Sequence, residues 1–164
     1  MIVVRHARPV VDPTTPTEQW VLTPEGLAAA VELGTHLSGR ADAVIASTER
    51  KAIDTAAALG VGPVTSSAAL DEVGRPWYDR ADDLANAAAR WFAGEIVEGW
   101  EPFDDAVARF GTGVAFAEIV VSHGTVMTAW LASEDAIDDA FAFWRALRMP
   151  DAWELGPTLV RCLP

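Results

Sequence analysis

The feature that most constrains the fold is a series of short apolar runs separated by longer helical stretches. Residues 2–4 and 118–122 are rich in β-branched side chains, which is typical of strands buried on both faces of a sheet. Residues 43–46 form a weaker candidate, and 61–65 is weaker still because it contains Gly-Pro. Residues 158–163 alternate polar and apolar side chains as an edge strand does. The chain is therefore expected to build its core around a sheet.

Three helices are expected between these runs. A Thr-Pro-Glu sequence at 23–25 has the order of an N-cap, a first-turn proline and a first-turn acid, and Gly39 ends the helix that follows. Ser47 is a candidate cap for a second helix that reaches about residue 59, and a third helix begins near Thr125. Strands that alternate with helices predict an α/β fold, a three-layer α/β/α sandwich around a mostly parallel sheet.

A small helical excursion is expected within a single domain that spans residues 1–164. Residues 75–113 carry several aromatic side chains among acidic and alanine-rich segments, without a strand signal. We expect this stretch to form a helical insert beside the functional site. Its aromatic residues either pack the outer layer or join Arg75 in lining a specificity pocket.

Charge and cysteine content narrow the classes of partner and compartment. Twelve Lys and Arg against 24 Asp and Glu give a net charge of −12, which repels nucleic acid and anionic membranes. An anionic ligand must therefore be bound by a local cluster of positive groups. The single cysteine, Cys162, cannot form an internal disulfide, and no apolar run approaches the roughly 20 residues of a membrane span. These features favour a cytoplasmic protein and leave its oligomeric state open.

Two of the three histidines follow predicted buried strands. His6 comes after the 2–4 run and His123 after the 118–122 run, whereas His36 lies in mid-helix. Ligands of open α/β sheets bind outside the carboxyl ends of the strands. We therefore expect His6 and His123 to share one pocket and His36 to lie outside it.

Metal and nucleotide sites are not indicated. The chain has no HExxH, no paired histidines at helical spacing and no glycine-rich phosphate loop. No metal or organic cofactor is expected. The acidic pairs lack the spacing of a calcium loop and are expected to be solvated helix faces; they are Asp82-Asp83, Asp104-Asp105 and Asp138-Asp139.

Two cations at the start of the second helix oppose the local electrostatics. Arg50 and Lys51 lie in the first turn, where the positive end of the helix dipole makes each cation unfavourable by about 0.3–1 kcal/mol. A bound anion nearby would make this arrangement favourable. The alternative is that both side chains reach solvent and pair with Glu49 or Asp54. The residues alone leave both interpretations open.

Five short motifs, in order, resemble those of the histidine phosphatase superfamily, which includes the phosphoglycerate mutases. Residues 5–7 (Arg-His-Ala) resemble its RHG signature, and residues 22–26 are similar to its LTxxG helix start. Residues 47–56 look like its SxxxRAxxTA segment, 70–72 match its LxE, and 121–124 match its VSHG. The resemblance spans nearly the whole chain, with the helical insert the least constrained part.

The resemblance implies a cofactor-independent phosphatase that hydrolyses a small phosphomonoester through a phosphohistidine intermediate. It makes His6 the nucleophile, and it makes Glu72 the proton donor to the leaving group and then the base that activates water. To be an acid at neutral pH, Glu72 needs a raised pKa, through burial or the incoming phosphate. His123 would also donate to the phosphate oxygens as their charge grows. The residues that the resemblance places around the phosphate are Arg5, Lys51, His123 and Gly124.

Two positions depart from the family's pattern. Ala7 stands where glycine is usual, so a methyl group lies where the backbone approaches the phosphate; this is harmless if its φ is ordinary. Lys51 stands where arginine is usual, and it supplies charge without a bidentate contact. Neither change removes a reacting group, so an active phosphatase is favoured. The alternatives are a phospho-ligand-binding protein without turnover and a phosphotransferase of the phosphoglycerate mutase type.

Overall fold

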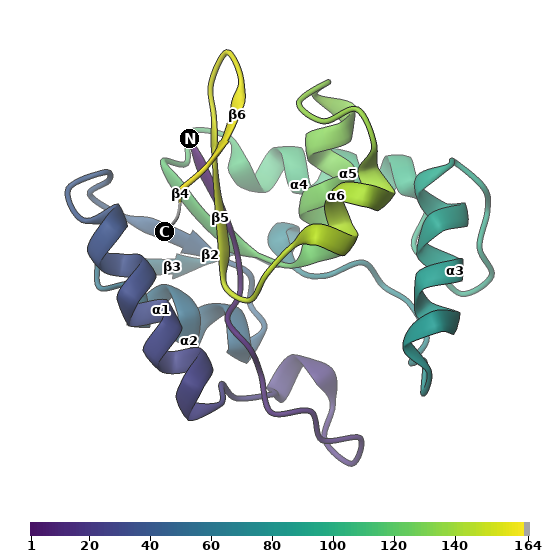
Figure 1. Ribbon diagram of the computed structural model, residues 1–164, viewed down its shortest axis with the longest axis horizontal. Helices are drawn as coiled ribbons and strands as arrows, with labels where there is room; N and C mark the ends of the chain where they lie inside the picture. Colours follow the sequence, from purple (N-terminus) through teal and green to yellow (C-terminus); the bar gives the residue numbers. More distant parts are fainter. Residues whose placement is uncertain (163–164) are drawn as a thin grey trace.

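The computed structural model describes residues 1–162 and shows a six-stranded sheet between layers of helices (Figure 1). The strand order is β3-β2-β4-β1-β5-β6. The first four of these run parallel, and the last two are antiparallel to their neighbours. The predicted α/β sandwich around a mostly parallel sheet is confirmed. The strands are β1 (Ile2–Arg5), β2 (Val44–Ala46), β3 (Val64–Ser66), β4 (Ile119–Ser122), β5 (Asp151–Leu155) and β6 (Leu159–Arg161).

Helices cover both faces of the sheet. Helices α1 and α2 pack together on one face, and α4 and α5 pack together on the other (Figure 1). Helix α6 packs on α5, and α3 packs on α6 at the outer side. The helices are α1 (Pro24–Leu37), α2 (Arg50–Leu59), α3 (Ala81–Phe92), α4 (Phe103–Val114), α5 (Gly124–Ser133) and α6 (Ala140–Ala146), with short 3-10 turns η1 (Thr17–Gln19) and η2 (Ala68–Leu70).

Burial on both faces of the sheet explains why the two central strands each begin with three apolar residues. Val3 and Val120 point into the core beneath α4 and α5, whereas Val4 and Val121 point into the core beneath α1 and α2. Successive strand residues face opposite sides of a sheet, so both sides of β1 and β4 must be apolar. All four side chains are fully buried. This burial fixes the register that brings the carboxyl ends of β1 and β4 side by side.

Helix starts follow the predictions in one case and not in another. The Thr23 side chain caps α1 by accepting a hydrogen bond from the Gly26 amide at 2.9 Å. Ser47 does not cap α2, because that helix begins at Arg50 with Glu49 as its N-cap residue. The Ser47 hydroxyl faces the histidine site instead, so the expected cap is wrong.

The sequence predicted only one of the two antiparallel strands at this edge of the sheet. Strand β6 lies at the edge of the sheet, as expected for 158–163, although residue 163 is outside the described part. Strand β5 was not predicted because its sequence, Asp-Ala-Trp-Glu-Leu, has no β-branched run. Its buried Asp151 accepts hydrogen bonds from the Arg148 amide and the Arg161 guanidinium. Tertiary contacts thus allow a charged residue inside this strand.

The 75–113 stretch contains α3 and most of α4, with its aromatic residues divided between two roles. Trp91 and Trp100 are buried in the core beneath these helices, while Trp77 is exposed and lines a cavity. The acidic pairs at 82–83 and 104–105 lie exposed in the first turns of α3 and α4. Within residues 1–162, no helix is long and apolar enough to cross a membrane.

Candidate active site

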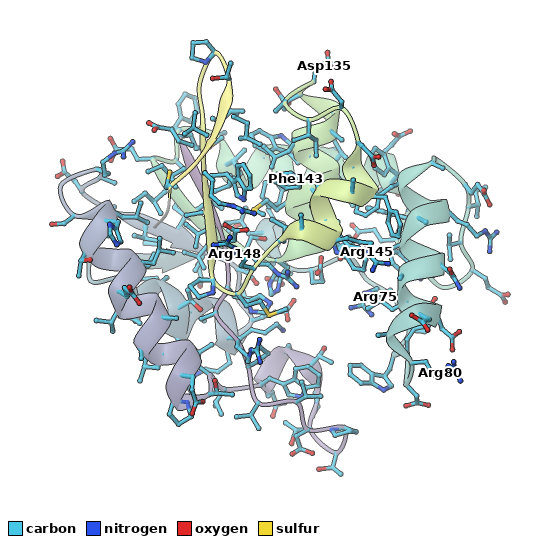
Figure 2. All side chains as sticks on the ribbon, in the orientation of Figure 1. Arg75, Arg80, Asp135, Phe143, Arg145 and Arg148 are labelled. Carbon is cyan, nitrogen blue, oxygen red and sulfur yellow. The ribbon has the colours of Figure 1, made fainter. Side chains whose placement is uncertain are left out.

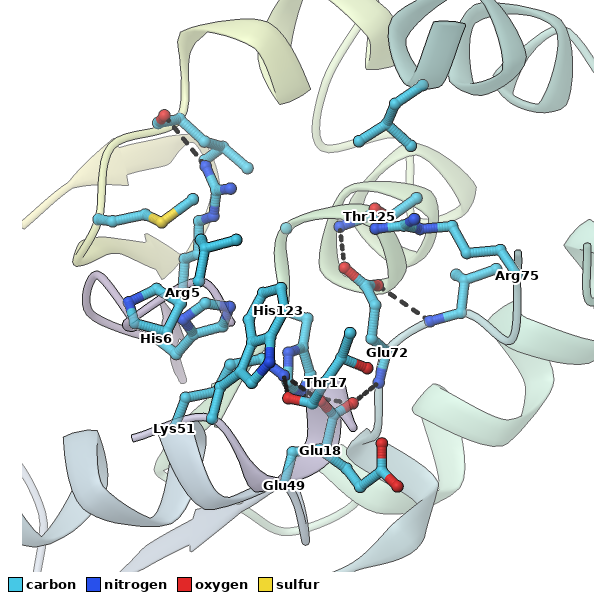
Figure 3. Close-up of a pocket in the computed structure, with 18 of the residues that line it drawn as sticks. Arg5, His6, Thr17, Glu18, Glu49, Lys51, Glu72, Arg75, His123 and Thr125 are labelled. Atoms are coloured by element: carbon cyan, nitrogen blue, oxygen red, sulfur yellow. Dashed lines mark hydrogen bonds and ion pairs between the residues drawn. The ribbon is translucent and has the colours of Figure 1, made fainter. Parts of the chain in front are cut away.

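The carboxyl ends of β1 and β4 bring two histidines together. Arg5 is the register partner of Ser122, and the His6 amide donates to the Ser122 carbonyl at 2.9 Å. The imidazole centroids of His6 and His123 are 5.1 Å apart, with their planes at 61°. Both rings line a cavity of about 880 Å³ (Figure 3). His36 is exposed on α1 and has no part in this cavity.

The cavity gathers positive charge on an otherwise acidic chain. Arg75 reaches it from the segment before α3, and Arg148 from the segment between α6 and β5 (Figure 2). Three glutamates also line it, but Lys and Arg outnumber them, the reverse of the chain as a whole. A local cluster of this kind attracts an anion that the acidic surface would otherwise repel. The cationic lining residues are Arg5, Arg8, Lys51, Arg75 and Arg148.

The protonation state of His6 is set by its neighbour along the chain. Its Nδ1 lies 2.8 Å from the Ala7 carbonyl oxygen, and a carbonyl only accepts hydrogen bonds, so Nδ1 carries the proton. Burial, His123 and nearby cations lower the pKa of His6 well below its usual value despite that hydrogen bond. The ring is therefore neutral at pH 7, with a lone pair on Nε2. This is the form that an imidazole needs to act as a nucleophile.

A chain of hydrogen bonds fixes the ring of His123. The Ser47 hydroxyl donates to Asp71 Oδ1 at 2.7 Å, so its oxygen accepts from His123 Nε2 at 2.8 Å. Burial lowers the pKa of His123 to about 3, although Glu72 and Asp71 act to raise it. The ring is neutral in the free protein, and Nδ1 lacks the proton. A bound anion beside it would favour the protonated ring.

Three buried polar atoms of residues that line the cavity have no partner within residues 1–162: Arg5 Nε, Arg75 Nε and His123 Nδ1. The Arg5 guanidinium lies against Gly124, where an added Cβ would be 3.1 Å from Nε. Glycine at this position therefore gives Arg5 its room. A buried polar atom without a partner costs about 1–3 kcal/mol. Three such atoms around one cavity indicate a polar ligand.

The two cations at the start of α2 go to different places. The Lys51 side chain is buried and lines the cavity, where Nζ donates to the Thr17 carbonyl at 2.9 Å and pairs with Glu49. Arg50 is exposed and pairs with Asp54 at 2.7 Å, one turn along the helix. The solvent-pairing interpretation thus holds for Arg50, and only Lys51 belongs to the site.

Glu72 lines the cavity on the opposite side of His123 from His6 (Figure 3). Its carboxylate accepts from the Thr125 amide at 3.3 Å and the Val126 amide at 3.0 Å, at the start of α5. Burial raises the pKa of Glu72, but electrostatic interactions with His123 and Arg75, together with backbone amides, outweigh it and lower the pKa to about 2. Burial therefore does not make Glu72 an acid in the free site. The amides of Thr125 and Val126 are therefore occupied by this carboxylate in the free site.

Ala7 is accommodated without strain. Its side chain is fully buried, and its φ is not in the left-handed region. Its amide donates to Thr55 Oγ1 at 2.9 Å, and that hydroxyl donates to the Lys51 carbonyl at 2.7 Å. Thr55 therefore ties the segment that carries His6 to the helix that carries Lys51.

The sequence did not identify several residues of this site, among them Ser47, Asp71 and Glu49. The first two hold His123, and the third contacts both Lys51 and His123. Glu49 was considered only as a solvent-exposed partner of the neighbouring cations. The available signal was an acid two residues before a cation that the family pattern already placed at the phosphate. Within residues 1–162, no cluster of three His, Cys, Asp or Glu residues could hold a metal ion.

Solved structures of phosphatases share this fold. A mycobacterial glucosyl-3-phosphoglycerate phosphatase in complex with inorganic phosphate has a TM-score of 0.68 and 21% identity, over 98% of this chain and 94% of its own. A putative alpha-ribazole-5'-P phosphatase from Escherichia coli has a TM-score of 0.66 and 22% identity, over 98% and 94%. A putative phosphohistidine phosphatase SixA from Nakamurella has a TM-score of 0.54 and 22% identity, over 93% and 83%.

Sequence comparison matches most of the chain to one family profile but finds no similar curated sequence. No curated protein sequence is significantly similar to it. The sequence profile of the histidine phosphatase superfamily (branch 1) matches residues 1–152. This range includes the two cavity histidines, Lys51 and Glu72. The chain belongs to the histidine phosphatase superfamily, branch 1.

Proposed function

We propose that this chain is a cofactor-independent phosphatase that hydrolyses a small phosphomonoester through a phosphohistidine on His6. The observation that carries the proposal is the state of the His6 ring. Its Nδ1 proton is held by the Ala7 carbonyl at 2.8 Å, its pKa is lowered, and its Nε2 lone pair is free to react at the cavity. Membership of a phosphatase superfamily supports the same chemistry.

The first half-reaction transfers the phosphoryl group to the protein. The phosphate oxygens lie among Arg5, Lys51 and His123, which supply charge where it grows in the transition state. Nε2 of His6 attacks phosphorus, and the bond from phosphorus to the ester oxygen breaks. The leaving oxygen takes a proton from Glu72. Because the pKa of Glu72 is lowered to about 2 in the free site, the phosphate dianion must raise it for this step.

The second half-reaction regenerates the free protein. A water attacks phosphorus as its bond to Nε2 of His6 breaks, and the Glu72 carboxylate takes one proton from that water. Inorganic phosphate leaves, and His6 returns to its neutral form. The net reaction adds one water to one phosphomonoester.

Hydrolysis of a generic aryl phosphate in the presence of EDTA tests the proposal. We expect phosphate release by the wild-type protein, loss of release in His6→Ala, and wild-type release in His36→Ala, which removes an exposed imidazole on α1. Release that needs a divalent metal, or that survives His6→Ala, would contradict the mechanism.

A phospho-ligand-binding protein without turnover is the second candidate. Two observations favour it: the pKa of Glu72 is lowered to about 2, and Lys51 already pairs with Glu49. Calorimetry with inorganic phosphate separates the two candidates. Phosphate binding without hydrolysis of a panel of phosphorylated metabolites would support the binding protein.

A further inference from the structure

Glu49 is an acidic residue inside the cavity that would receive the phosphate group. It is 9% exposed, and one carboxylate oxygen pairs with Lys51 Nζ (Figure 3). The other oxygen lies 3.3 Å from His123 Nε2 and accepts from the Glu72 amide at 3.0 Å. One carboxylate therefore contacts two of the side chains that the proposed function assigns to phosphate.

The position of this side chain is not explained by helix capping. Glu49 is the N-cap residue of α2, yet its side chain makes no capping hydrogen bond. A short polar side chain at an N-cap ordinarily accepts from the first helical amides. The Glu49 carboxylate instead reaches into the cavity, and the buried pair that it forms with Lys51 is weak grounds for a role in stability.

The contacts of Lys51 show what a ligand would have to displace. Its Nζ donates to the neutral Thr17 carbonyl and pairs with the charged Glu49 carboxylate. Of these two partners, only Glu49 is an anion, and it therefore competes directly with a phosphate oxygen for Lys51. A phosphate that bound Lys51 while this carboxylate stayed in place would bring two anions together around one ammonium group, which is unfavourable in a buried site.

We propose that Glu49 is an internal competitor for the phosphate group, which gives up Lys51 when a phosphomonoester binds and takes it back when phosphate leaves. The inference rests on the proposed function for the identity of the ligand. It makes Glu49 a determinant of anion affinity: the site holds phosphate less tightly than its cations alone would allow. Product release then becomes easier at the expense of substrate affinity.

Direct binding of inorganic phosphate, measured by calorimetry, tests the inference independently of turnover. We expect Glu49→Gln to bind phosphate about tenfold more tightly or better, because the neutral amide no longer competes for Lys51. The matched control is Glu18→Gln, which removes a charge from an exposed residue lining the same cavity. This control should change the affinity by less than about twofold, since exposed charges are screened.

Coupling to Lys51 provides the second arm. In a Lys51→Ala background, Glu49→Gln should increase the affinity for phosphate less than it does in the wild type, because the competition for Lys51 is absent and only the contact with His123 remains. If Glu49→Gln fails to fold, Glu49→Asp retracts the carboxylate and should tighten phosphate binding in the same direction. Unchanged or weaker phosphate binding in the folded Glu49 variants would overturn the inference, and weaker binding would show that Glu49 positions Lys51 for phosphate.

Kinetics distinguishes this inference from a merely structural role. In Glu49→Gln, both the KM for an aryl phosphate and the inhibition constant for inorganic phosphate should fall together, with the thermal midpoint little changed. Phosphate binding that tightens in a protein without hydrolysis would support the role of Glu49 and refute the proposed phosphatase. Hydrolysis with no change in KM or in the inhibition constant for phosphate would support the proposed phosphatase and refute the role of Glu49.

Discussion

Removing the Ser47 hydroxyl tests whether one hydroxyl group holds His123 in place. In Ser47→Ala, three contacts are lost: the 2.7 Å bond to Asp71, the 2.8 Å bond from His123 and the 3.1 Å bond from the Glu49 amide. A hydrogen bond whose buried partner is left behind is worth about 1–2 kcal/mol. Because Asp71 keeps its bonds from Thr48, we expect a total loss of about 2–4 kcal/mol in the free energy of unfolding.

Urea unfolding of the purified variant measures this loss. The matched control is Ser66→Ala, at an exposed position of edge strand β3, which should cost less than about 0.5 kcal/mol. Hydrolysis by Ser47→Ala should also slow by about 10- to 100-fold, because the His123 ring is no longer fixed. A variant as stable as the wild type to within about 0.5 kcal/mol, or with unchanged kcat, would refute the assigned hydrogen-bond chain.

Three further predictions follow from the site. The pKa of His123 is lowered from 6.5 to about 3 in the folded chain, so the unfolded chain binds the extra proton between these values and stability falls as pH falls below about 6.5. His123→Asn should therefore flatten the rise of the unfolding free energy between pH 4 and 6, seen by urea titration, by on the order of 1 kcal/mol per pH unit, whereas His36→Asn should not. Ala7→Gly should lower stability by about 0.5–1 kcal/mol without raising kcat, because Ala7 has an ordinary φ; a large gain in kcat would show that the methyl group obstructs the phosphate. Lys51→Ala should weaken phosphate binding by about tenfold or more, and Arg50→Ala should leave it unchanged in calorimetry; equal effects would contradict their different placement.

The sequence predicts best where one physical requirement dominates. Strands β1 and β4 are apolar at their first three positions because both faces are buried, and the residue after each strand then lies at a common edge. This requirement placed His6 and His123 in one pocket. The Thr23 cap of α1 was predictable for a similar reason, since the capping bond joins Thr23 to an amide only three residues away.

The sequence predicts poorly where a residue's role depends on distant partners. Ser47 has the pattern of a helix cap, yet Asp71 and His123 hold its hydroxyl elsewhere. Strand β5 has no β-branched residue, and it forms because β1 and β6 provide hydrogen bonds on both sides. Such long-range contacts override local preference.

Glu49 shows why site chemistry is harder to predict than the fold. Its sequence position fits an exposed acid beside two cations, but α2 begins two residues later than a Ser47 cap implies, and the Glu49 side chain lines the cavity. Only the family resemblance identified Lys51 as a site residue, because local electrostatics did not distinguish Lys51 from Arg50. The direction of these side chains depends on the first turn of α2, which local patterns define least well.

The most direct test of the account is to trap the phosphorylated protein. The wild-type protein is mixed rapidly with an aryl phosphate, quenched in alkali within a turnover, and analysed by peptide mass spectrometry. We expect a phosphoryl group on His6 that forms and decays at the rates of turnover, and that is absent from His6→Ala. Hydrolysis without any phosphorylated peptide, or with the phosphoryl group on another residue, would contradict it.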